Sequence, residues 1–340
     1  MSGILIIGGY GHVGHQIAAG LQGAGRAQVR IAGRDAGRAA AVAAKLGCGW
    51  AVMDLRQPES WEAALAGIGT VIVCIDLPDA GFPAHVLGRG LAYIDISATD
   101  SVLRRIEGLD ASARQQGGCA VLSVGLAPGL SNLMARAAVE GMGQVEAVSI
   151  GVLLGLGDAH GPAAVDWTLD NLRPVSAADV RMTGFGPEAT PVPTIPFAFA
   201  DQLVLARRHA MAGVTTRLGL ASPLITRGTL RLLAGLAQRP GFRRLLRWSM
   251  ARFRLGSDRA SLVVEAVGRG AGGPLRHRLT LDGRAEAAIT ALIAAQVALM
   301  LPARARPGVW HIEELWQLSD FAAALKAEGI ALGAQNSASA

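Results

Sequence analysis

The chain has 340 residues, of which 51% are hydrophobic, and its formal net charge is +6. This length and apolar content suffice for one large or two ordinary domains with their own cores, and they exclude an intrinsically disordered protein. The longest apolar stretch, 287–301, is interrupted by Thr290 and Gln296 and is shorter than the roughly 20 residues of a spanning helix. We therefore expect a buried helix there.

The first residues, 1–7, lack the basic region and cleavage site of a secretory signal and are expected to form a strand, which predicts a cytoplasmic protein. Cys48, Cys74 and Cys119 are scattered, without the paired spacing of a zinc site or a disulfide framework. The histidines show no metal-ligand spacing either. We expect reduced thiols in the core and no metal site.

The first part of the chain alternates short apolar runs with alanine-rich segments, an order that predicts a parallel sheet with helices on both faces. The expected strands are 4–7, 29–32, 50–53, 70–75, 92–96 and 120–124. The expected helices are 13–21, 36–46, 60–65, 83–89 and 102–116. The Gly-Leu-Ala-Pro-Gly turn at 125–129 breaks this order and is the expected domain boundary.

Beyond that turn the chain changes character. Strand-like runs occur at 145–154, 261–267 and 277–281. They predict a second, partly antiparallel sheet. The proline-rich segment 187–196 is expected to be an ordered loop or a lid, and 226–253 to be helical with a break at Pro240. The predicted fold class is α/β: a Rossmann doubly wound parallel sheet with a second α+β domain containing a mixed or antiparallel sheet.

A glycine-rich turn directly follows the first expected strand and opens the first expected helix. Gly9, Gly11 and Gly14 fit the spacing G-x-G-x-x-G, whose glycines let the backbone approach a pyrophosphate while the helix N-terminus supplies amide donors. The pattern alone is weak, and a glycine turn that binds nothing is the alternative, but the strand–turn–helix context is the one required. The predicted cofactor-binding residues of this turn are Gly8, Gly9, Tyr10, Gly11, His12, Val13 and Gly14.

The residues after the second expected strand discriminate between cofactors. An NAD site has an acid there that holds the ribose 2′-hydroxyl, whereas this chain has Gly33-Arg34-Asp35. Arg34 can pair with a 2′-phosphate, so NADP is the favoured cofactor. Asp35 keeps NAD open, because a small backbone shift would place it where the arginine is expected. Asp76, after the fourth expected strand, is expected near the nicotinamide ribose.

With these residues the chain resembles the saccharopine dehydrogenase-like family, also called the saccharopine reductase or saccharopine dehydrogenase NADP-binding-domain family. The resemblance spans most of the chain and rests on the glycine turn with 33–35, on Tyr-Ile-Asp-Ile-Ser at 93–97, and on 125–132, with a weaker similarity from 307 to 330. It implies pyridine-nucleotide oxidoreduction, in the best-known members at a secondary amine or imine linking amino acids. Ala127 stands where saccharopine reductases typically carry Asp, so we expect a substrate other than saccharopine.

The resemblance also implies the domain organisation. We expect a Rossmann domain at 1–125, a substrate and dimerisation domain at 126–305, and a C-terminal segment at 306–340 that returns to the Rossmann domain. A homodimer through the second domain is the expected assembly.

Candidate catalytic groups are few. Asp95, at a strand end, is the best candidate for orienting an amine or relaying a proton, with a structural capping role as the alternative, and Ser97 follows it toward the cleft. Asn132 either contacts the cofactor or substrate or simply caps the helix after the Pro-Gly turn. His160, in a glycine-rich loop, is a weaker acid/base candidate.

The positive charge is concentrated in one stretch. From Gln202 to Ser257 there is no Asp or Glu, while eleven arginines occur. We favour a solvated basic face; an acidic substrate, a phosphate or an anionic membrane surface are the alternatives, the membrane being the less favoured partner. The stretch lacks the aromatic-basic interleaving typical of nucleic-acid binding, so no nucleic-acid partner is expected.

The sequence therefore predicts an NADP-dependent oxidoreductase of a small molecule such as an amino-acid-derived imine or secondary amine. Two alternatives stay open. One is an enoyl or keto reductase acting on an apolar substrate, and the other is a non-enzymatic nucleotide-binding module associated with a membrane.

Overall fold

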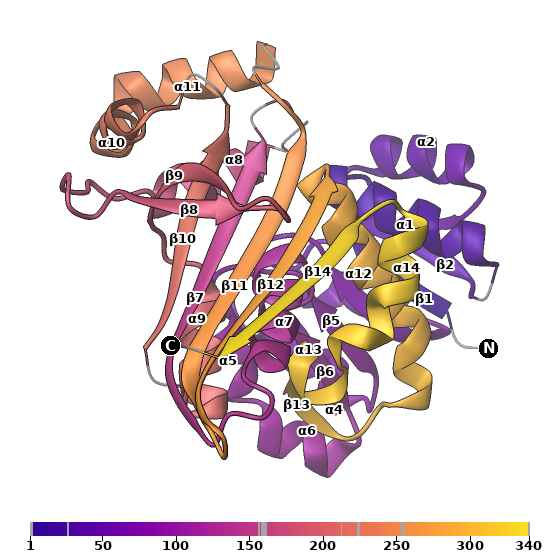
Figure 1. The fold of residues 1–340 in the computed structure, drawn as a ribbon. Helices are drawn as coiled ribbons and strands as arrows, with labels where there is room; N and C mark the ends of the chain where they lie inside the picture. Colours follow the sequence, from indigo (N-terminus) through magenta and orange to yellow (C-terminus); the bar gives the residue numbers. More distant parts are fainter. Residues whose placement is uncertain are drawn as a thin grey trace. The chain divides into compact units, whose positions relative to one another are not determined.

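The structure is a computed structural model in which the chain forms two compact units (Figure 1). Unit 1 comprises residues 1–129 and 287–316, and unit 2 comprises 130–286 and 317–340. The residues described are 3–25, 27–155, 157, 162–211, 213–222, 225–252 and 256–338. His160 and Phe253, which the sequence placed in a loop and in a helix, lie outside these residues.

Unit 1 is built on a parallel seven-stranded sheet, sheet A, in the order β13-β6-β5-β4-β1-β2-β3. Its strands are β1 (Gly3–Ile7), β2 (Val29–Gly33), β3 (Gly49–Val52), β4 (Ile68–Val73), β5 (Ala92–Asp95), β6 (Cys119–Leu122) and β13 (Gly308–His311). The strand order reverses between β1 and β4, which is where doubly wound sheets bind their ligands. The predicted Rossmann sheet is confirmed.

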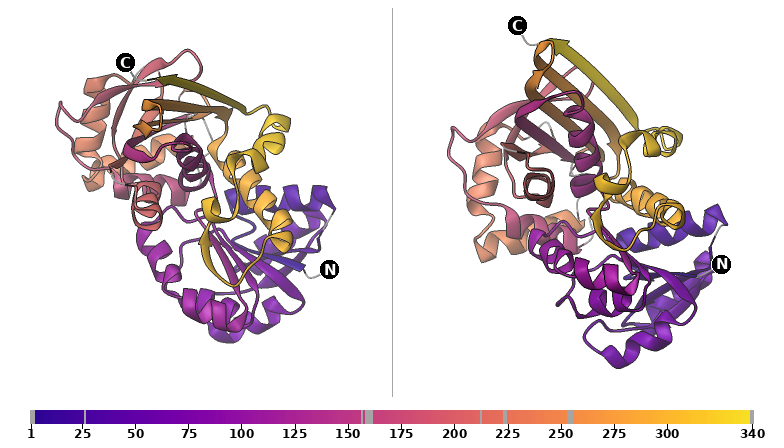
Figure 2. Two further views of the ribbon diagram at one scale, coloured as in Figure 1. Left: turned by 60° about the horizontal axis from the view of Figure 1, so that its bottom comes forward. Right: turned by 90° about the horizontal axis from the view of Figure 1, so that it is seen from below.

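Helices cover both faces of sheet A, as Figure 2 shows. They are α1 (His12–Ala24), α2 (Ala36–Leu46), α3 (Trp61–Leu65), α4 (Gly81–Gly88), α5 (Asp100–Glu107), α6 (Asp110–Gln116), α12 (Glu286–Met300) and α13 (Ile312–Leu315). The strand order proceeds outward from β1 to β3 on one side of the sheet and from β4 to β6 on the other. Right-handed crossovers therefore place α1 and α2 on one face and α4 to α6 on the other. The single helix predicted for 102–116 is two helices that meet at Gly108.

The apolar helix α12 belongs to unit 1 apart from its first residue. Among the described residues, 286–303 is one helical stretch whose length and composition would allow it to cross a membrane, and 56% of it is buried within the structure. Ala295 faces Gly20 of α1, and the Thr290 hydroxyl accepts a hydrogen bond of 3.2 Å from the Leu126 amide. These contacts confirm the prediction of a buried helix.

Unit 2 contains a mixed seven-stranded sheet, sheet B, in the order β14-β12-β11-β7-β10-β9-β8, in which only the pair β7–β10 is parallel. Its strands are β7 (Gln144–Gly155), β8 (Arg181–Phe185), β9 (Thr190–Pro196), β10 (Val214–Ala221), β11 (Arg259–Gly270), β12 (Gly273–Arg284) and β14 (Ala331–Ala338). Its helices are α7 (Ser131–Ala138), α8 (Pro162–Asn171), α9 (Ala200–His209), α10 (Arg227–Leu236), α11 (Pro240–Arg252) and α14 (Ala322–Ala327).

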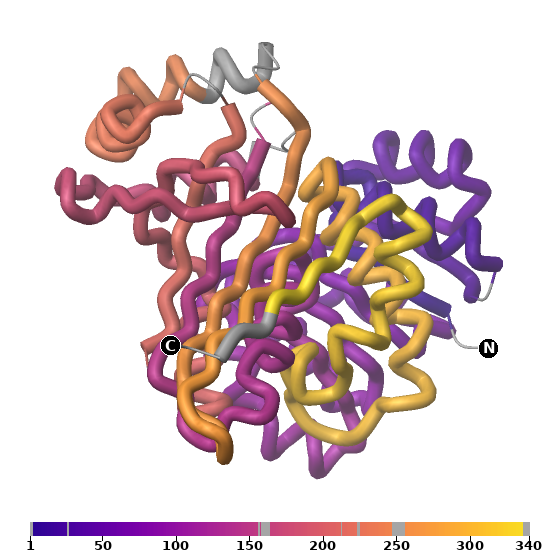
Figure 3. Tube along the Cα trace, viewed as in Figure 1, coloured from indigo at the N-terminus to yellow at the C-terminus, as the bar shows by residue number. Residues whose placement is uncertain are grey.

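The proline-rich segment 187–196 is not the loop or lid that its composition predicts. It contributes strand β9, which forms a hairpin with β8 that can be followed in Figure 3. Pro191 and Pro193 are two residues apart, so the amide donors they lack would all point to the same edge of the strand. That edge carries no partner there, because β10 pairs only with residues 194–196.

The predicted domain boundaries also differ from the two units. Residues 130–286 and 317–340 form unit 2, and 287–316 belongs to unit 1 with α12 and β13. Only the first part of the segment 306–340 returns to the Rossmann unit, because β13 pairs with β6 whereas β14 pairs with β12 of sheet B. Local patterns identify a strand, but they do not state which sheet it joins.

The β8–β9 hairpin is held on sheet B by a small core in which Phe185 is fully buried against Leu153 and Val263. We predict that Phe185→Ala lowers the free energy of unfolding by about 3–5 kcal/mol, since it removes a large side chain and leaves a cavity. Urea unfolding followed by circular dichroism measures this. Met182→Ala, on the same strand at a 42% exposed position, is the control and should stay within about 0.5 kcal/mol of wild type. Equal losses in both variants would contradict the assignment of this core.

Candidate functional site

The turn between β1 and α1 is closed by unusually tight backbone packing. The Gly11 amide donates to the Gly8 carbonyl at 2.8 Å. A Cβ on Gly14 would lie 2.4 Å from the same carbonyl oxygen, so no other residue fits there. This packing sets the first turn of α1 directly against the end of β1, as a dinucleotide-binding turn requires.

The N-terminus of α1 is open to an anion. Gly11 is the N-cap and supplies no side-chain hydrogen bond, and the first turn contains no acidic residue. The first amides of a helix point outward and carry a partial positive charge, which favours a phosphate group. His12 is exposed, and Val13 is half-buried beside it. The predicted cofactor-binding residues of the turn thus lie together at the carboxyl edge of sheet A.

Tyr10 connects this turn to the end of β2. A Cβ on Gly33 would lie 2.3 Å from the Tyr10 ring, so the ring packs directly against this end of β2. The Tyr10 hydroxyl accepts a hydrogen bond of 3.2 Å from the Asp35 amide, and the Arg38 guanidinium lies 4.7 Å from the ring centroid. Arg38 is thus stacked on Tyr10, and Arg34, on the turn between β2 and α2, is exposed.

Asp35 is engaged in its own helix. Its carboxylate Oδ1 accepts a hydrogen bond of 2.9 Å from the Arg38 amide, which makes Asp35 the N-cap of α2. Arg34, one residue earlier, is exposed. At the position that distinguishes the two cofactors, the acid caps a helix and the arginine faces solvent.

The ends of β4 and β5 bring a second group of candidates to the same edge of the sheet. Asp95 is 1% exposed, and its carboxylate accepts hydrogen bonds of 2.6 Å from the Tyr93 hydroxyl and 2.7 Å from the Ser97 amide. The Ser97 hydroxyl accepts one of 3.2 Å from the Thr99 amide. Asp76 is exposed after β4.

Burial raises the pKa of Asp95 to about 6, against the lowering effect of the hydrogen bonds from Tyr93 and Ser97, and the charge of Asp76 adds to the rise. Burial and the Asp95 charge also raise the pKa values of Tyr93 and Cys74. Carboxyl groups perturbed in this way are enriched at functional sites. Asp95 is therefore both well fixed by its neighbours and able to change protonation near neutral pH.

Asn132 belongs to unit 2, whereas the candidates above belong to unit 1. It is fully buried in the first turn of α7, and the Ser131 hydroxyl lies 3.4 Å from its Oδ1. Its predicted contact with a cofactor or substrate stays a prediction.

The structure also contains a buried polar network that the sequence analysis did not predict. The Ser123 hydroxyl lies 2.8 Å from Nδ1 of His311, whose Nε2 lies 3.0 Å from a Glu107 carboxylate oxygen. Ser123 and His311 are fully buried, and this serine–histidine–glutamate arrangement links the ends of β6 and β13 to the end of α5. The two residues are 188 positions apart, and no local pattern links them. Among the described residues no cluster with metal-ligand composition occurs.

Solved structures share this fold over almost the whole chain. Saccharopine dehydrogenase (L-Glu forming) from Saccharomyces cerevisiae matches with a TM-score of 0.69 at 15% identity, covering 99% of this chain and 100% of that one. DAP dehydrogenase from C. glutamicum, solved with DAP, matches with a TM-score of 0.51 at 14% identity, over 94% and 98% of the two chains. An engineered D-amino acid dehydrogenase matches with a TM-score of 0.50 at 13% identity, over 95% and 99%.

No protein-family model matches the sequence, and no curated protein matches it significantly. The resemblance read from the glycine turn, from 93–97 and from 125–132 is thus matched in three dimensions: the chain has the fold of saccharopine dehydrogenase.

The buried carboxyl of Asp95 gives a pH dependence that can be measured. Because its folded pKa of about 6 lies above the ordinary value of 3.8, the folded protein holds this proton more tightly than the unfolded chain. Its contribution to stability is complete below about pH 4 and is lost as the pH rises through about 6, which amounts to about 3 kcal/mol.

We predict that Asp95→Asn removes this dependence. Urea unfolding of wild type and variant at several pH values between 4 and 7.5 should show the wild type losing stability relative to the variant as the pH rises. Parallel curves over this range would contradict the raised pKa.

Proposed function

We propose that the chain is a nicotinamide-dinucleotide-dependent oxidoreductase that prefers NADP and acts on an amino-acid-derived imine or secondary amine. The observation that carries the proposal is the β1–α1 turn. Gly14 packs on the Gly8 carbonyl, and the helix that follows begins with neither a capping side chain nor an acid. A pyrophosphate is the ligand that such a turn fits.

The residues after β2 support NADP. Arg34 is exposed where an adenosine 2′-phosphate would lie, and Arg38 is held over the Tyr10 ring one helical turn later. A guanidinium pairs with phosphate through two parallel hydrogen bonds and also stacks on aromatic faces. Asp35, the acid that would favour NAD, has one carboxylate oxygen occupied as the cap of α2.

The substrate class is proposed from the fold neighbours. Saccharopine dehydrogenase, DAP dehydrogenase and the engineered D-amino acid dehydrogenase are each named for amino-acid chemistry. A bound reduced nicotinamide supplies a hydride for the carbon of an imine. The protein then has to fix the substrate, exclude water and manage one proton.

Asp95 and Ser97 are the groups that we propose for orientation and proton relay. Asp95 is held by two hydrogen bonds and has a pKa of about 6, so it exchanges a proton near neutral pH, as a general acid or base must. Ser97 follows at the strand end, with its hydroxyl oriented by the Thr99 amide.

Introducing an acid at the exposed first position of α1 tests the cofactor site without disturbing the fold. We predict that His12→Asp preserves or slightly raises the melting temperature, because a negative charge at a helix N-terminus is favourable. The same charge should weaken NADPH binding about ten-fold or more, since it opposes the pyrophosphate. Calorimetric titration measures the affinity, and His12→Ser is the neutral control. Undiminished binding in His12→Asp would place the dinucleotide elsewhere.

Cofactor preference depends on Arg34. We predict that Arg34→Ala lowers the affinity for NADPH by about 10- to 100-fold, the equivalent of about 1.5–3 kcal/mol for hydrogen bonds to a charged group, while the affinity for NADH changes little. Arg105→Ala, which removes an exposed arginine of the same unit on α5, is the control. Equal losses for both dinucleotides would refute the preference.

Activity is tested by mixing the protein with NADPH and paired amino acids and 2-oxo acids, which form imines in solution, and following the NADPH absorbance. We expect oxidation with at least one pair, and slower oxidation by His12→Asp at NADPH concentrations that do not saturate the variant. Tight dinucleotide binding without turnover of any imine, enoyl or keto substrate would remove the enzymatic part of the proposal.

A further inference from the structure

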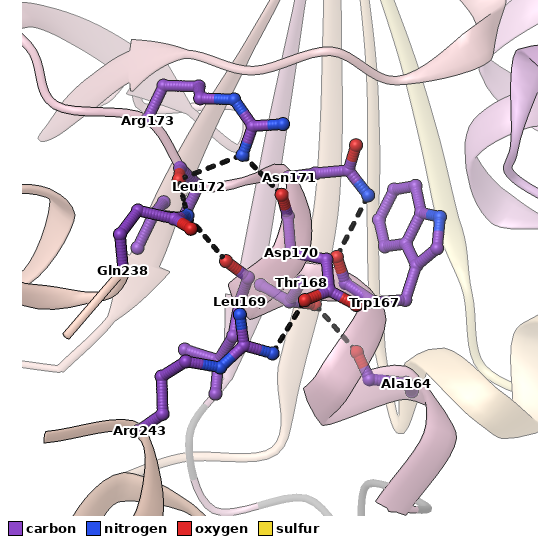
Figure 4. Close-up of polar contacts among 10 residues, drawn as sticks. All are labelled: Ala164, Trp167, Thr168, Leu169, Asp170, Asn171, Leu172, Arg173, Gln238 and Arg243. Atoms are coloured by element: carbon purple, nitrogen blue, oxygen red, sulfur yellow. Dashed lines mark hydrogen bonds and ion pairs between the residues drawn. The ribbon is translucent and has the colours of Figure 1, made fainter. Parts of the chain in front are cut away.

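Helices α10 and α11 form a paired segment at one end of strands β7, β10 and β11 in unit 2 (Figure 1). Gln238, between the two helices, donates from its side-chain amide to the carbonyl oxygens of Leu169 at 3.1 Å and Leu172 at 2.6 Å, at the end of α8. Arg243 pairs with Asp170 at 2.6 Å (Figure 4). These contacts fix which side of the segment faces the protein.

The α8 end that receives the segment is itself well ordered by local contacts. The Asn171 side chain donates to the Trp167 carbonyl at 2.9 Å, and the Trp167 ring packs at 5.6 Å from the rings of Phe197 and Phe199. The segment α10–α11 therefore contacts an end of α8 that has its own stabilising contacts.

The opposite side of α10 faces solvent with an apolar residue at its centre. Leu230 and Ala234 are buried, and at 3.6 residues per turn Leu232 lies on the other side of the helix. Leu232 is 60% exposed. Its neighbours on that side, Gly228 and Gly235, have no side chains to cover it.

Helix α11 repeats this arrangement. Arg243 faces α8, whereas Leu245 is 55% exposed. Leu232 and Leu245 are the two most exposed leucines among the large hydrophobic residues of the described chain. Single exposed apolar residues are ordinary, but two of them on adjoining helices indicate a surface that a partner or a membrane covers.

The charges around the two leucines are all of one sign. Arg231 and Arg244 are exposed on α10 and α11, and Arg239 is exposed between the two helices. Neither helix contains an Asp or Glu, and the acid-free stretch extends from Gln202 to Ser257. Arginines beside exposed leucines are the composition of a helix that lies in a membrane interface, where arginines meet lipid phosphates.

We propose that the outward face of the segment α10–α11, defined by Arg231, Leu232, Arg239 in the connection, Arg244 and Leu245, binds the surface of an anionic phospholipid bilayer. The two leucines enter the headgroup boundary, and the three arginines pair with lipid phosphates. A solvated basic face, the interpretation favoured from the sequence, accounts for the arginines but leaves the exposure of both leucines without a reason. This binding does not depend on the proposed oxidoreductase activity.

Vesicle sedimentation of the full-length protein tests the proposal. Wild type should sediment with vesicles of phosphatidylcholine and phosphatidylglycerol far more than with phosphatidylcholine alone, and less as salt increases. Replacing Arg231, Arg239 and Arg244 by Gln should lower the partition coefficient about five-fold per arginine. Leu232→Gln with Leu245→Gln should lower it about ten-fold or more, because apolar insertion is lost.

Matched controls separate this face from general basic charge. Arg105→Gln removes an exposed arginine of α5, and Leu203→Gln changes a 40% exposed leucine of α9. Both should sediment as wild type does. All substituted positions are exposed, so circular dichroism and NADPH titration should be unchanged in every variant.

Two results would overturn the proposal. One is sedimentation of the arginine and leucine variants to the same extent as wild type. The other is binding to soluble poly-glutamate without binding to anionic vesicles, which would assign the face to an acidic protein partner instead.

Discussion

The approach of Gly14 to the Gly8 carbonyl oxygen is the constraint on which the candidate site depends. It lets α1 begin directly at the end of β1, so that the first amides of the helix face the carboxyl edge of sheet A where the strand order reverses. The ends of β2, β4 and β5 lie along the same edge. Tyr10, Arg34 and Asp95 therefore lie at one edge of the sheet because one turn and one strand order place them there.

The two ends of this sheet edge differ in charge: one carries exposed arginines and the other a buried carboxyl group. Near β2, exposed Arg34 and Arg38 stand beside a helix start without an acid, which suits phosphate groups. Near β5, Asp95 is buried and holds a proton to about pH 6. An anion-binding end and a proton-exchanging end would serve the hydride transfer to an imine proposed above, beyond the nicotinamide itself.

The sequence predicted those parts of the molecule that local patterns encode. The βαβ order gave the strands of sheet A up to β6, and the spacing of Gly9, Gly11 and Gly14 gave the turn. It could not predict contacts made across long separations, such as Ser123 with His311, or the sheet that β13 and β14 each join. Composition misled at 187–196, because proline is excluded only from strand edges that must donate hydrogen bonds.

We propose that dinucleotide phosphates bind at the β1–α1 turn and beside Arg34. Phosphorus-31 NMR of NADP⁺ titrated with the protein tests it most directly, because the pyrophosphate and the 2′-phosphate give separate signals. We expect both signals to shift and broaden, with the pKa of the 2′-phosphate lowered by arginine. A pyrophosphate shift without a 2′-phosphate shift would contradict the NADP preference, and unchanged signals would contradict the site itself.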